Sequence, residues 1–261
     1  MKIGNFDTDS KALKNRIDLQ EKLGYFDLNQ WIFSKLNPEK GSACLDLGCG
    51  QGNQSLPLAK LIGARGSVDS VDISEESIQI LREKAQQLNI NNRIKTIHSK
   101  LDDIELYLNN KQFDYIVASY SLYYVHDANR MFLTIEKHLK ADGRLFFCGP
   151  SNRNNSELRR IISNITGDRS ILKNTVASKF MEHSSQKICS KLFQDIEVFS
   201  FKNPINFPNP ESVISYWRSH NLFMENYDSL FVNEILKYFD KYGQFTNTKY
   251  GIGICCKKSN Y

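Results

Sequence analysis

The chain has 261 residues, of which 41% are hydrophobic and 24% are charged, a composition typical of ordinary globular proteins. Its formal net charge is +5 without any dense run of lysine and arginine, which argues against a nucleic-acid-binding arm. No apolar stretch approaches the ~20 residues of a membrane-spanning helix, and the first ten residues contain no apolar signal core. We therefore expect neither a membrane protein nor a secreted one.

The cysteines give no sign of a metal site or of disulfide bonds. None of the six forms a Cys-x-x-Cys pair, and no histidine stands at zinc-finger spacing. In apolar, strand-like runs a free cysteine behaves as a small hydrophobic residue, and four lie in such runs: Cys44, Cys148, Cys255 and Cys256. The sequence therefore predicts reduced thiols, no metal and a cytoplasmic protein.

The N-terminal part of the chain has the spacing of helices. One apolar pattern runs from Leu13 to Leu23 and a second from Leu28 to Leu36. Pro38 then interrupts the chain before the first predicted strand. The pattern predicts a helical cap over residues 1–40.

The most informative stretch is residues 43–53, which read Ala-Cys-Leu-Asp-Leu-Gly-Cys-Gly-Gln-Gly-Asn. The apolar run from Ala43 to Leu47 has the length of a buried strand, and a helical pattern follows the glycines. Glycines permit a tight turn and leave no Cβ between the backbone and a ligand. Strand, glycine turn and helix predict a nucleotide-binding α/β unit, in which ligands lie at the carboxyl ends of the strands.

The spacing of the glycines indicates which nucleotide. A dinucleotide fingerprint reads Gly-x-Gly-x-x-Gly, whereas this chain has Asp46-x-Gly48-x-Gly50-x-Gly52. That pattern resembles motif I of the class I S-adenosylmethionine (SAM) methyltransferases. The resemblance implies that this loop, including Cys49, lies against the methionine and ribose of SAM. It also implies that Asp46 helps to order the loop and the amino group of the cofactor.

The same resemblance bears on the helical cap. In the family such a prefix packs beside the cofactor mouth and helps to close it. Arg16 and Tyr25 are therefore candidate contacts to the methionine end of SAM. Ordinary surface or packing positions are the alternative for both residues.

The second strand is predicted over residues 67–72 and ends in Asp72. An acid at this distance from a glycine loop can accept two hydrogen bonds from a ribose diol, and Ile73 beside it is a further candidate cofactor contact. The alternative role for Asp72 is a helix N-cap, for which Ser74 competes. Residues 75–88 then have helical spacing.

The third strand is predicted over residues 94–98, and the turn after it meets the adenine in the resembled family. The family has an acid and then a small residue there, but this chain has Lys100 and Leu101. The resemblance implies that Leu101 meets the adenine through its backbone N–H. Asp102 would then be the acidic residue of the family pattern, shifted along the chain from its usual position.

The fourth strand is predicted over residues 113–118 and runs into a segment rich in tyrosine, residues 119–127. Side chains at this end of a parallel sheet face the cofactor and the substrate. We assign Ser119 to the cofactor and His126 to general-base chemistry, with three tyrosines shielding the site and orienting the acceptor: Tyr120, Tyr123 and Tyr124. Core packing is the alternative for the tyrosines. The segment lacks the Asn/Asp-Pro-Pro-Tyr/Phe sequence of adenine-N6 and glutamine-N5 methyltransferases, which argues against those substrates.

The remaining chain is expected to complete the sheet. Its apolar patterns predict three strands and three helices, the strands over 144–148, 193–201 and 249–257 and the helices over 128–140, 211–219 and 227–240. Residues 151–190 carry weak helix signals and are expected to form a helical or loop lid over the substrate. Asn203-Pro204 and Asn209-Pro210 are expected to bracket a loop.

Together the motifs predict an α/β fold with the Rossmann-like seven-stranded sheet of class I methyltransferases. We expect helices on both faces, a reversed last strand, an N-terminal helical cap and a helical, substrate-binding insert near the C-terminus. The chain would be a single globular unit divided into a cap (1–40), a SAM-binding core (41–150) and the rest of the sheet with lid and insert (151–261).

The resemblance implies an enzyme that transfers a methyl group from SAM to nitrogen or oxygen of a small-molecule metabolite or natural-product intermediate. An RNA or protein methyltransferase is the alternative enzyme. A SAM-binding protein without catalysis is the alternative from another class. We expect no nucleic-acid or membrane partner, and a monomer and a homodimer both remain open.

Overall fold

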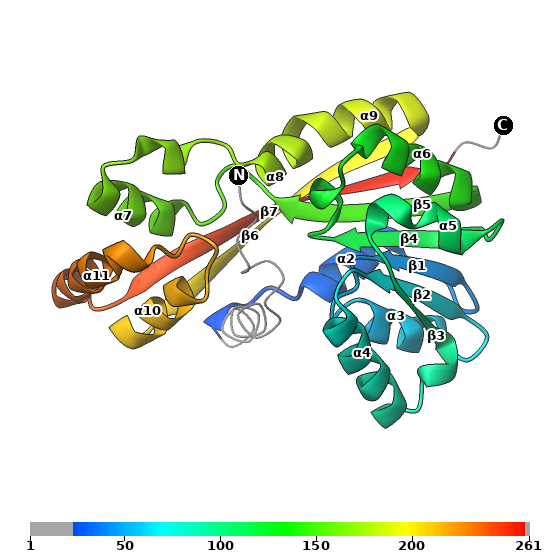
Figure 1. The fold of residues 1–261 in the computed structure, drawn as a ribbon, viewed down its shortest axis with the longest axis horizontal. Coiled ribbons are helices and arrows are strands. Elements are labelled where there is room, and N and C mark those ends of the chain that lie inside the picture. The colour runs from blue at the N-terminus through cyan, green and yellow to red at the C-terminus, as the bar shows by residue number, and fades with distance from the viewer. Residues whose placement is uncertain (1–22, 259–261) are drawn as a thin grey trace. The chain divides into compact units, whose positions relative to one another are not determined.

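Seven strands form one sheet in the order β3-β2-β1-β4-β5-β7-β6 (Figure 1). The structure is a computed structural model that describes residues 23–258. Its strands are β1 (Ala43–Leu47), β2 (Ser67–Asp72), β3 (Ile94–His98), β4 (Phe113–Ser119), β5 (Leu139–Pro150), β6 (Asp195–Phe207) and β7 (Phe245–Lys257). The pairs β1–β2, β1–β4, β2–β3 and β4–β5 are parallel, whereas the arrow of β7 points opposite to that of β5 in Figure 1. The seven-stranded sheet with a reversed last strand is confirmed.

The chain divides into two compact units, which are described separately. Within the described residues, the core unit contains 28–151, 176–200 and 252–258, and the insert unit contains 23–27, 152–175 and 201–251. The core unit holds all of β1 to β5, and β6 and β7 continue from one unit into the other. The sequential division into 1–40, 41–150 and 151–261 stays a prediction.

Helices cover both faces of the sheet in the core unit. They are α2 (Leu28–Leu36), α3 (Ser55–Ile62), α4 (Glu75–Gln87), α5 (Glu105–Leu108), α6 (Ala128–His138), α8 (Val176–Lys179) and α9 (Ser185–Leu192). Short turns of tighter or wider helix complete the unit: η2 (Asn91–Arg93), η3 (Leu101–Asp103), η4 (Leu122–Tyr124) and η6 (Phe180–Ser184). Side-chain caps begin two of the helices, because Ser74 accepts the N–H of Ser77 at α4 and Asp127 accepts the N–H of Arg130 at α6.

The alternation of buried side chains along β5 separates the two faces. Leu145 and Phe147 belong to a hydrophobic cluster with residues of α6 and α9. Phe146 and Cys148 belong to another cluster, with residues of α2, α3 and α4. The sheet is therefore buried on both sides, as a mostly parallel sheet requires.

The insert unit has its own hydrophobic core. Its helices are α7 (Ser156–Thr166), α10 (Pro210–Arg218) and α11 (Asp228–Tyr242), with shorter turns η5 (Arg169–Leu172) and η7 (Glu225–Tyr227). Trp217 of α10 is fully buried and stacks on Phe231 of α11, with 3.9 Å between the ring centroids. The two helices predicted between the last two strands are confirmed, and Trp217 is a core residue.

The loop predicted around Asn203-Pro204 is wrong, because both residues lie inside β6. Proline lacks the N–H that a central strand must donate, so it favours edge strands. The sheet order places β6 at an edge, beside β7 alone. One further prediction cannot be compared with the structure in full, because most of the first predicted helix, over residues 13–23, lies outside the described residues. Within 23–258, no helix combines the length and apolar character that crossing a bilayer demands.

Candidate cofactor and active site

The glycine loop follows β1 and is shaped by positive backbone φ angles. Gly48 has φ of 80°, and a Cβ on it would stand 2.3 Å from the Cβ of Ser121. Gly50 has φ of 50°, but no atom lies within 4 Å of the place that its Cβ would occupy. Packing therefore requires glycine at position 48, whereas position 50 leaves open space against which a ligand can lie.

Asp72 fixes this loop from the neighbouring strand. One carboxylate oxygen, Oδ2, accepts the N–H of Gly50 at 2.8 Å, and Oδ1 accepts the N–H of Ser74 at 2.9 Å. Val71, one residue earlier, accepts the N–H groups of Gly48 and Cys49 through its carbonyl. Each carboxylate oxygen has a second lone pair, so Asp72 can hold the loop and also accept hydroxyl groups from a ribose.

Asp46 lies beneath the loop and is fully buried. Its Oδ2 accepts the hydroxyl of Ser55 at 2.5 Å, and Ser55 in turn accepts the hydroxyl of Ser70 at 2.9 Å. Its Oδ1 has no hydrogen-bond partner within the described part of the chain. Burial raises the pKa of Asp46 to about 7, and the Ser55 hydroxyl opposes that rise. Asp46 thus ties β1 to α3, whereas its predicted contact with the cofactor's amino group stays a prediction.

Three other predicted cofactor residues differ in exposure. The Cys49 side chain is buried against Ile78 and Leu81, so only its backbone faces the ligand side of the loop. Ile73 is 55% exposed directly after Asp72, where an apolar side chain could cover a nucleoside base. Tyr25 is 90% exposed and belongs to the insert unit, and Arg16 lies outside the described residues. The roles of these residues stay predictions.

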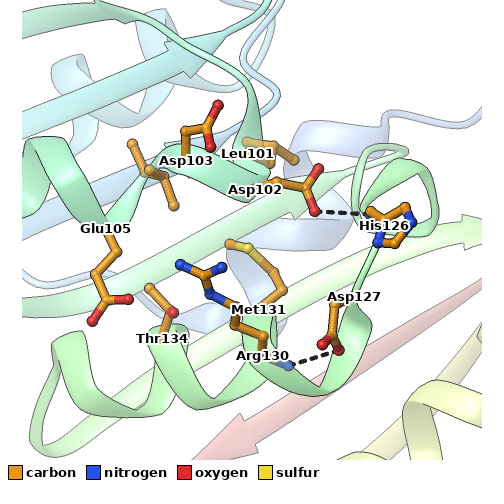
Figure 2. A pocket seen from close by; sticks show the side chains of 10 residues that line it. Leu101, Asp102, Asp103, Glu105, His126, Asp127, Arg130, Met131 and Thr134 are labelled. Carbon is orange, nitrogen blue, oxygen red and sulfur yellow. Dashed lines mark hydrogen bonds between the residues drawn. The ribbon is translucent and has the colours of Figure 1, made fainter.

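Leu101, Asp102 and His126 line one hollow of about 330 Å³ in the core unit (Figure 2). Asp102 points toward the segment after η4 in Figure 2, and its Oδ1 accepts the backbone N–H of His126 at 2.8 Å. The other lining residues lie in or directly beside η3, α5 and α6: Asp103, Ile104, Glu105, Asp127, Arg130, Met131 and Thr134. The structure therefore brings the predicted adenine turn and the predicted base together.

The three tyrosines pack differently. Tyr120 packs against the cluster that contains Phe146, and Tyr123 against the one that contains Phe147, on the opposite face of the sheet. Tyr124 is 54% exposed, and its ring centroid lies 4.6 Å from that of Tyr123. Burial, followed by the neighbouring Tyr124 and Tyr120, raises the pKa of Tyr123 well above its ordinary value. Tyr123 is therefore a neutral phenol that can donate a hydrogen bond but does not act as a base near pH 7.

Serines fix the end of β4. The hydroxyl of Ser119 lies 3.5 Å from the sulfur of Cys148 on β5. Ser121 was not predicted as a site residue, yet it is buried and donates its hydroxyl to the carbonyl of Leu47 at 2.5 Å. The signal for it was present in the sequence, because a small hydroxyl residue just past a strand can reach the end of the adjacent strand.

A second group that the sequence did not reveal joins α2 to the glycine loop. The side-chain amide of Asn29 donates to the carbonyl of Asn53 at 2.9 Å and accepts from Gln54 at 3.0 Å. These amides fix the beginning of α3 from the side of the predicted cap. The polar positions of the second predicted helix were the available signal.

The donors and acceptors of this edge suit a nucleoside cofactor. The space against Gly50 is open, Asp72 presents carboxylate lone pairs beside it, and Ile73 offers an exposed apolar surface. A ribose diol and a flat base match these features. The site therefore fits the adenosine part of SAM.

Comparison with known proteins agrees with this geometry. The family described as "Methyltransferase domain" matches residues 38–197, more than half of the chain. A demethylmenaquinone methyltransferase from Lactobacillus johnsonii is 26% identical over 189 residues, which cover 68% of this chain and 76% of that enzyme. A demethylmenaquinone methyltransferase from Staphylococcus epidermidis is 28% identical over 112 residues, which cover 43% of this chain and 44% of that enzyme.

Solved structures share the fold. A SAM-dependent methyltransferase from Aquifex aeolicus superposes with a TM-score of 0.56 at 14% identity, covering 95% of this chain and 97% of that one. The geranyl diphosphate C-methyltransferase from Streptomyces coelicolor, solved with Mg²⁺, geranyl-S-thiolodiphosphate and S-adenosyl-L-homocysteine, gives a TM-score of 0.52 at 14% identity. The superposition covers 88% of this chain and 74% of that enzyme. At such identities the likeness is one of fold.

Proposed function

The chain belongs to the methyltransferase domain family and is a SAM-dependent methyltransferase, and we propose that its acceptor is a small molecule methylated on nitrogen or oxygen. The observation that supports the site most strongly is the pairing of Gly50 with Asp72, which places an open backbone surface beside a carboxylate. SAM supplies an activated methyl group, so the protein has to bind and align the reactants.

We assign the cofactor to named residues of the core unit. The glycine loop would meet the methionine and ribose, Asp72 the ribose diol, and Ile73 and Leu101 the base. Ser119 lies at the end of β4 on the same edge of the sheet. This assignment uses the exposure of Ile73 and the hydrogen bonds of Asp72. Both residues lie at the carboxyl end of β2, the side of a parallel sheet on which ligands bind.

The acceptor side would be formed by the segment that follows β4. His126 is exposed at the hollow, where a neutral imidazole can accept a proton from an amine or a hydroxyl. Tyr123 would donate a hydrogen bond, and the exposed ring of Tyr124 would cover the acceptor. A carboxylate acceptor, already ionised at neutral pH, would need no base.

The name of the curated relatives supports a small-molecule acceptor, since demethylmenaquinone is a small molecule. A net charge of +5 without a basic run gives RNA no obvious surface to bind. An RNA or protein methyltransferase remains the alternative function. All six cysteines are free and buried, which supports our inference of a cytoplasmic setting. For the oligomeric state, a monomer and a homodimer both stay open.

The experiment has two stages. Calorimetry should show that SAM and S-adenosylhomocysteine bind and that NAD does not bind comparably, and tighter binding of NAD would overturn the cofactor assignment. Release of S-adenosylhomocysteine is then assayed with a panel of amines, phenols, quinols and carboxylates. Turnover with RNA or a protein but none with the panel would favour the alternative enzymes.

A further inference from the structure

One hydrogen bond joins two loops whose strands are not neighbours. Asp102 belongs to η3, directly after β3, and His126 follows η4, which comes after β4. In the sheet order β3-β2-β1-β4, two strands lie between them. Neighbouring strands are ~4.8 Å apart, so the ends of β3 and β4 are separated by roughly 14 Å. The 2.8 Å contact between Asp102 Oδ1 and the N–H of His126 therefore bridges the edge at which β1 and β2 end.

The segment from Ser119 to Asp127 is fastened at several points along its length. Ser121 is tied to the carbonyl of Leu47, at the end of β1. Tyr120 has φ of 58°, a left-handed conformation that non-glycine residues adopt at a cost and keep where their surroundings fix them. At the other end, Asp127 caps α6. Between η4 and that cap, the Asp102 carboxylate fixes the backbone of His126.

The bond acts on the backbone of His126 and so on the placement of this residue. The donor is the backbone N–H, so the imidazole is not part of the contact. Asp102 is half-buried, which reduces competition from water for its Oδ1. A hydrogen bond to a charged acceptor is stronger than one between neutral groups. The bond can therefore hold the residue at one place while leaving its side chain available.

We propose that Asp102 is a positioning residue that couples the cofactor loop after β3 to His126 on the acceptor side. This inference rests on the proposed function, in which Leu101, the neighbour of Asp102, meets the base of SAM. A cofactor that orders Leu101 also orders Asp102, and the hydrogen bond then orders His126. Coupling between two sites is reciprocal. If the cofactor strengthens the hydrogen bond by some factor, loss of the bond must weaken cofactor binding by the same factor.

Amide hydrogen exchange of His126, followed by NMR with and without S-adenosylhomocysteine, tests the bond directly. In the wild-type protein the His126 amide should be protected, and S-adenosylhomocysteine should slow its exchange further. Asp102→Ala should speed exchange about tenfold or more, the size of a hydrogen bond to a charged group, and should abolish the effect of S-adenosylhomocysteine. The matched control is Asp102→Asn, which keeps an oxygen acceptor and should retain most of the protection.

A cycle of variants tests the coupling independently. His126→Ala keeps the backbone N–H and should leave the affinity for S-adenosylhomocysteine unchanged, whereas His126→Pro removes that N–H and should weaken it as much as Asp102→Ala does. Val125 has φ of −67° and ψ of 146°, a conformation compatible with a following proline. The double variant Asp102→Ala/His126→Pro should bind no more weakly than either single variant.

Three results would overturn the proposal: unchanged His126 exchange in Asp102→Ala, additive losses in the double variant, or equal affinities of His126→Ala and His126→Pro. If Asp102→Asn weakens the binding of S-adenosylhomocysteine as much as Asp102→Ala does, the charge of Asp102 acts on the ligand directly, and the hydrogen bond to His126 is not the cause. Failure of the proposed function is recognised separately, because the wild-type protein would then not bind S-adenosylhomocysteine at all.

Discussion

The backbone N–H of Gly50 donates to the carboxylate of Asp72 across 2.8 Å, so an acid at the end of β2 fixes the loop that follows β1. The same carboxylate accepts the N–H of Ser74 at the beginning of α4. The glycine loop, the end of β2 and the beginning of α4 are therefore held together by one carboxylate. A ligand hydroxyl that reaches Asp72 comes to lie against the glycine loop. Gly50 and Asp72 are therefore the first residues to substitute in a test of the cofactor site.

Gly50→Val should abolish SAM binding, because the side chain would fill the open space beside the loop. A left-handed backbone alone costs about 1–2 kcal/mol of stability in any residue with a Cβ. Gly167→Val is the matched control, since Gly167 also has a positive φ, of 72°, and open space at its Cβ, but lies in the insert unit. Calorimetry with SAM and denaturant unfolding of both variants separate the two effects. Equal SAM affinities would show that the loop is not the cofactor site.

Asp72→Ala should weaken SAM binding at least about tenfold, since a hydrogen bond to a charged group contributes roughly 1.5–3 kcal/mol. The N–H groups of Gly50 and Ser74 also lose their acceptor in this variant. Asp72→Asn keeps one oxygen for them and should lose less affinity. Both variants must first be shown to be folded. If they bind SAM like the wild-type protein, Asp72 serves only as a link between the loop and α4.

The local pattern was sufficient to predict the strands that carry the cofactor site. β1, β2 and β3 coincide with the predicted ranges, since each is a short segment with strand-like apolar positions bounded by turn residues. The Asn203-Pro204 dipeptide was misinterpreted as part of a loop. A strand can contain this proline because β6 is an edge strand, and only the assembled sheet reveals which strands lie at its edges.

Side-chain pairing within the site could not be predicted in the same way. The bond between Ser121 and Leu47 and that between Asp102 and His126 join residues far apart in the chain. Each depends on how the ends of separate strands meet. Asp46 was expected at the cofactor, but its complete burial follows from the packing of α3 on β1 and β2, a tertiary effect.

Asp46 should make stability depend on pH. Burial raises its pKa from 3.8 to about 7, so between those values the folded protein binds more protons at this site than the unfolded chain. Stability from this residue is therefore lost as pH rises from about 4 to 7, by up to about 1.4 kcal/mol per pH unit. Asp46→Asn cannot ionise, so wild type should lose stability relative to this variant across that window. Urea unfolding at several pH values measures the difference.

The hydroxyl of Ser55 provides a control for this prediction. It lowers the pKa of Asp46 by donating to the carboxylate, so Ser55→Ala should move the window of pH dependence upward. Other carboxyl groups titrate in all three proteins and cancel in the comparison. Parallel stability curves for wild type and Asp46→Asn would mean that Asp46 remains ionised in the folded protein.

His126→Ala should keep the affinity for SAM and lower turnover by ~10²–10⁴-fold, the usual contribution of one general base. The side chain is exposed at the hollow, while its backbone N–H, which the alanine variant retains, maintains the link to Asp102. The measurement is single-turnover methyl transfer at several pH values near neutral, with whichever panel acceptor the wild-type protein methylates. Tyr124→Phe is a suitable comparison, since it removes one hydroxyl from the same segment and should change the rate far less. If His126→Ala turns over as fast as the wild-type protein at every pH, His126 is structural and methyl transfer here depends on alignment alone.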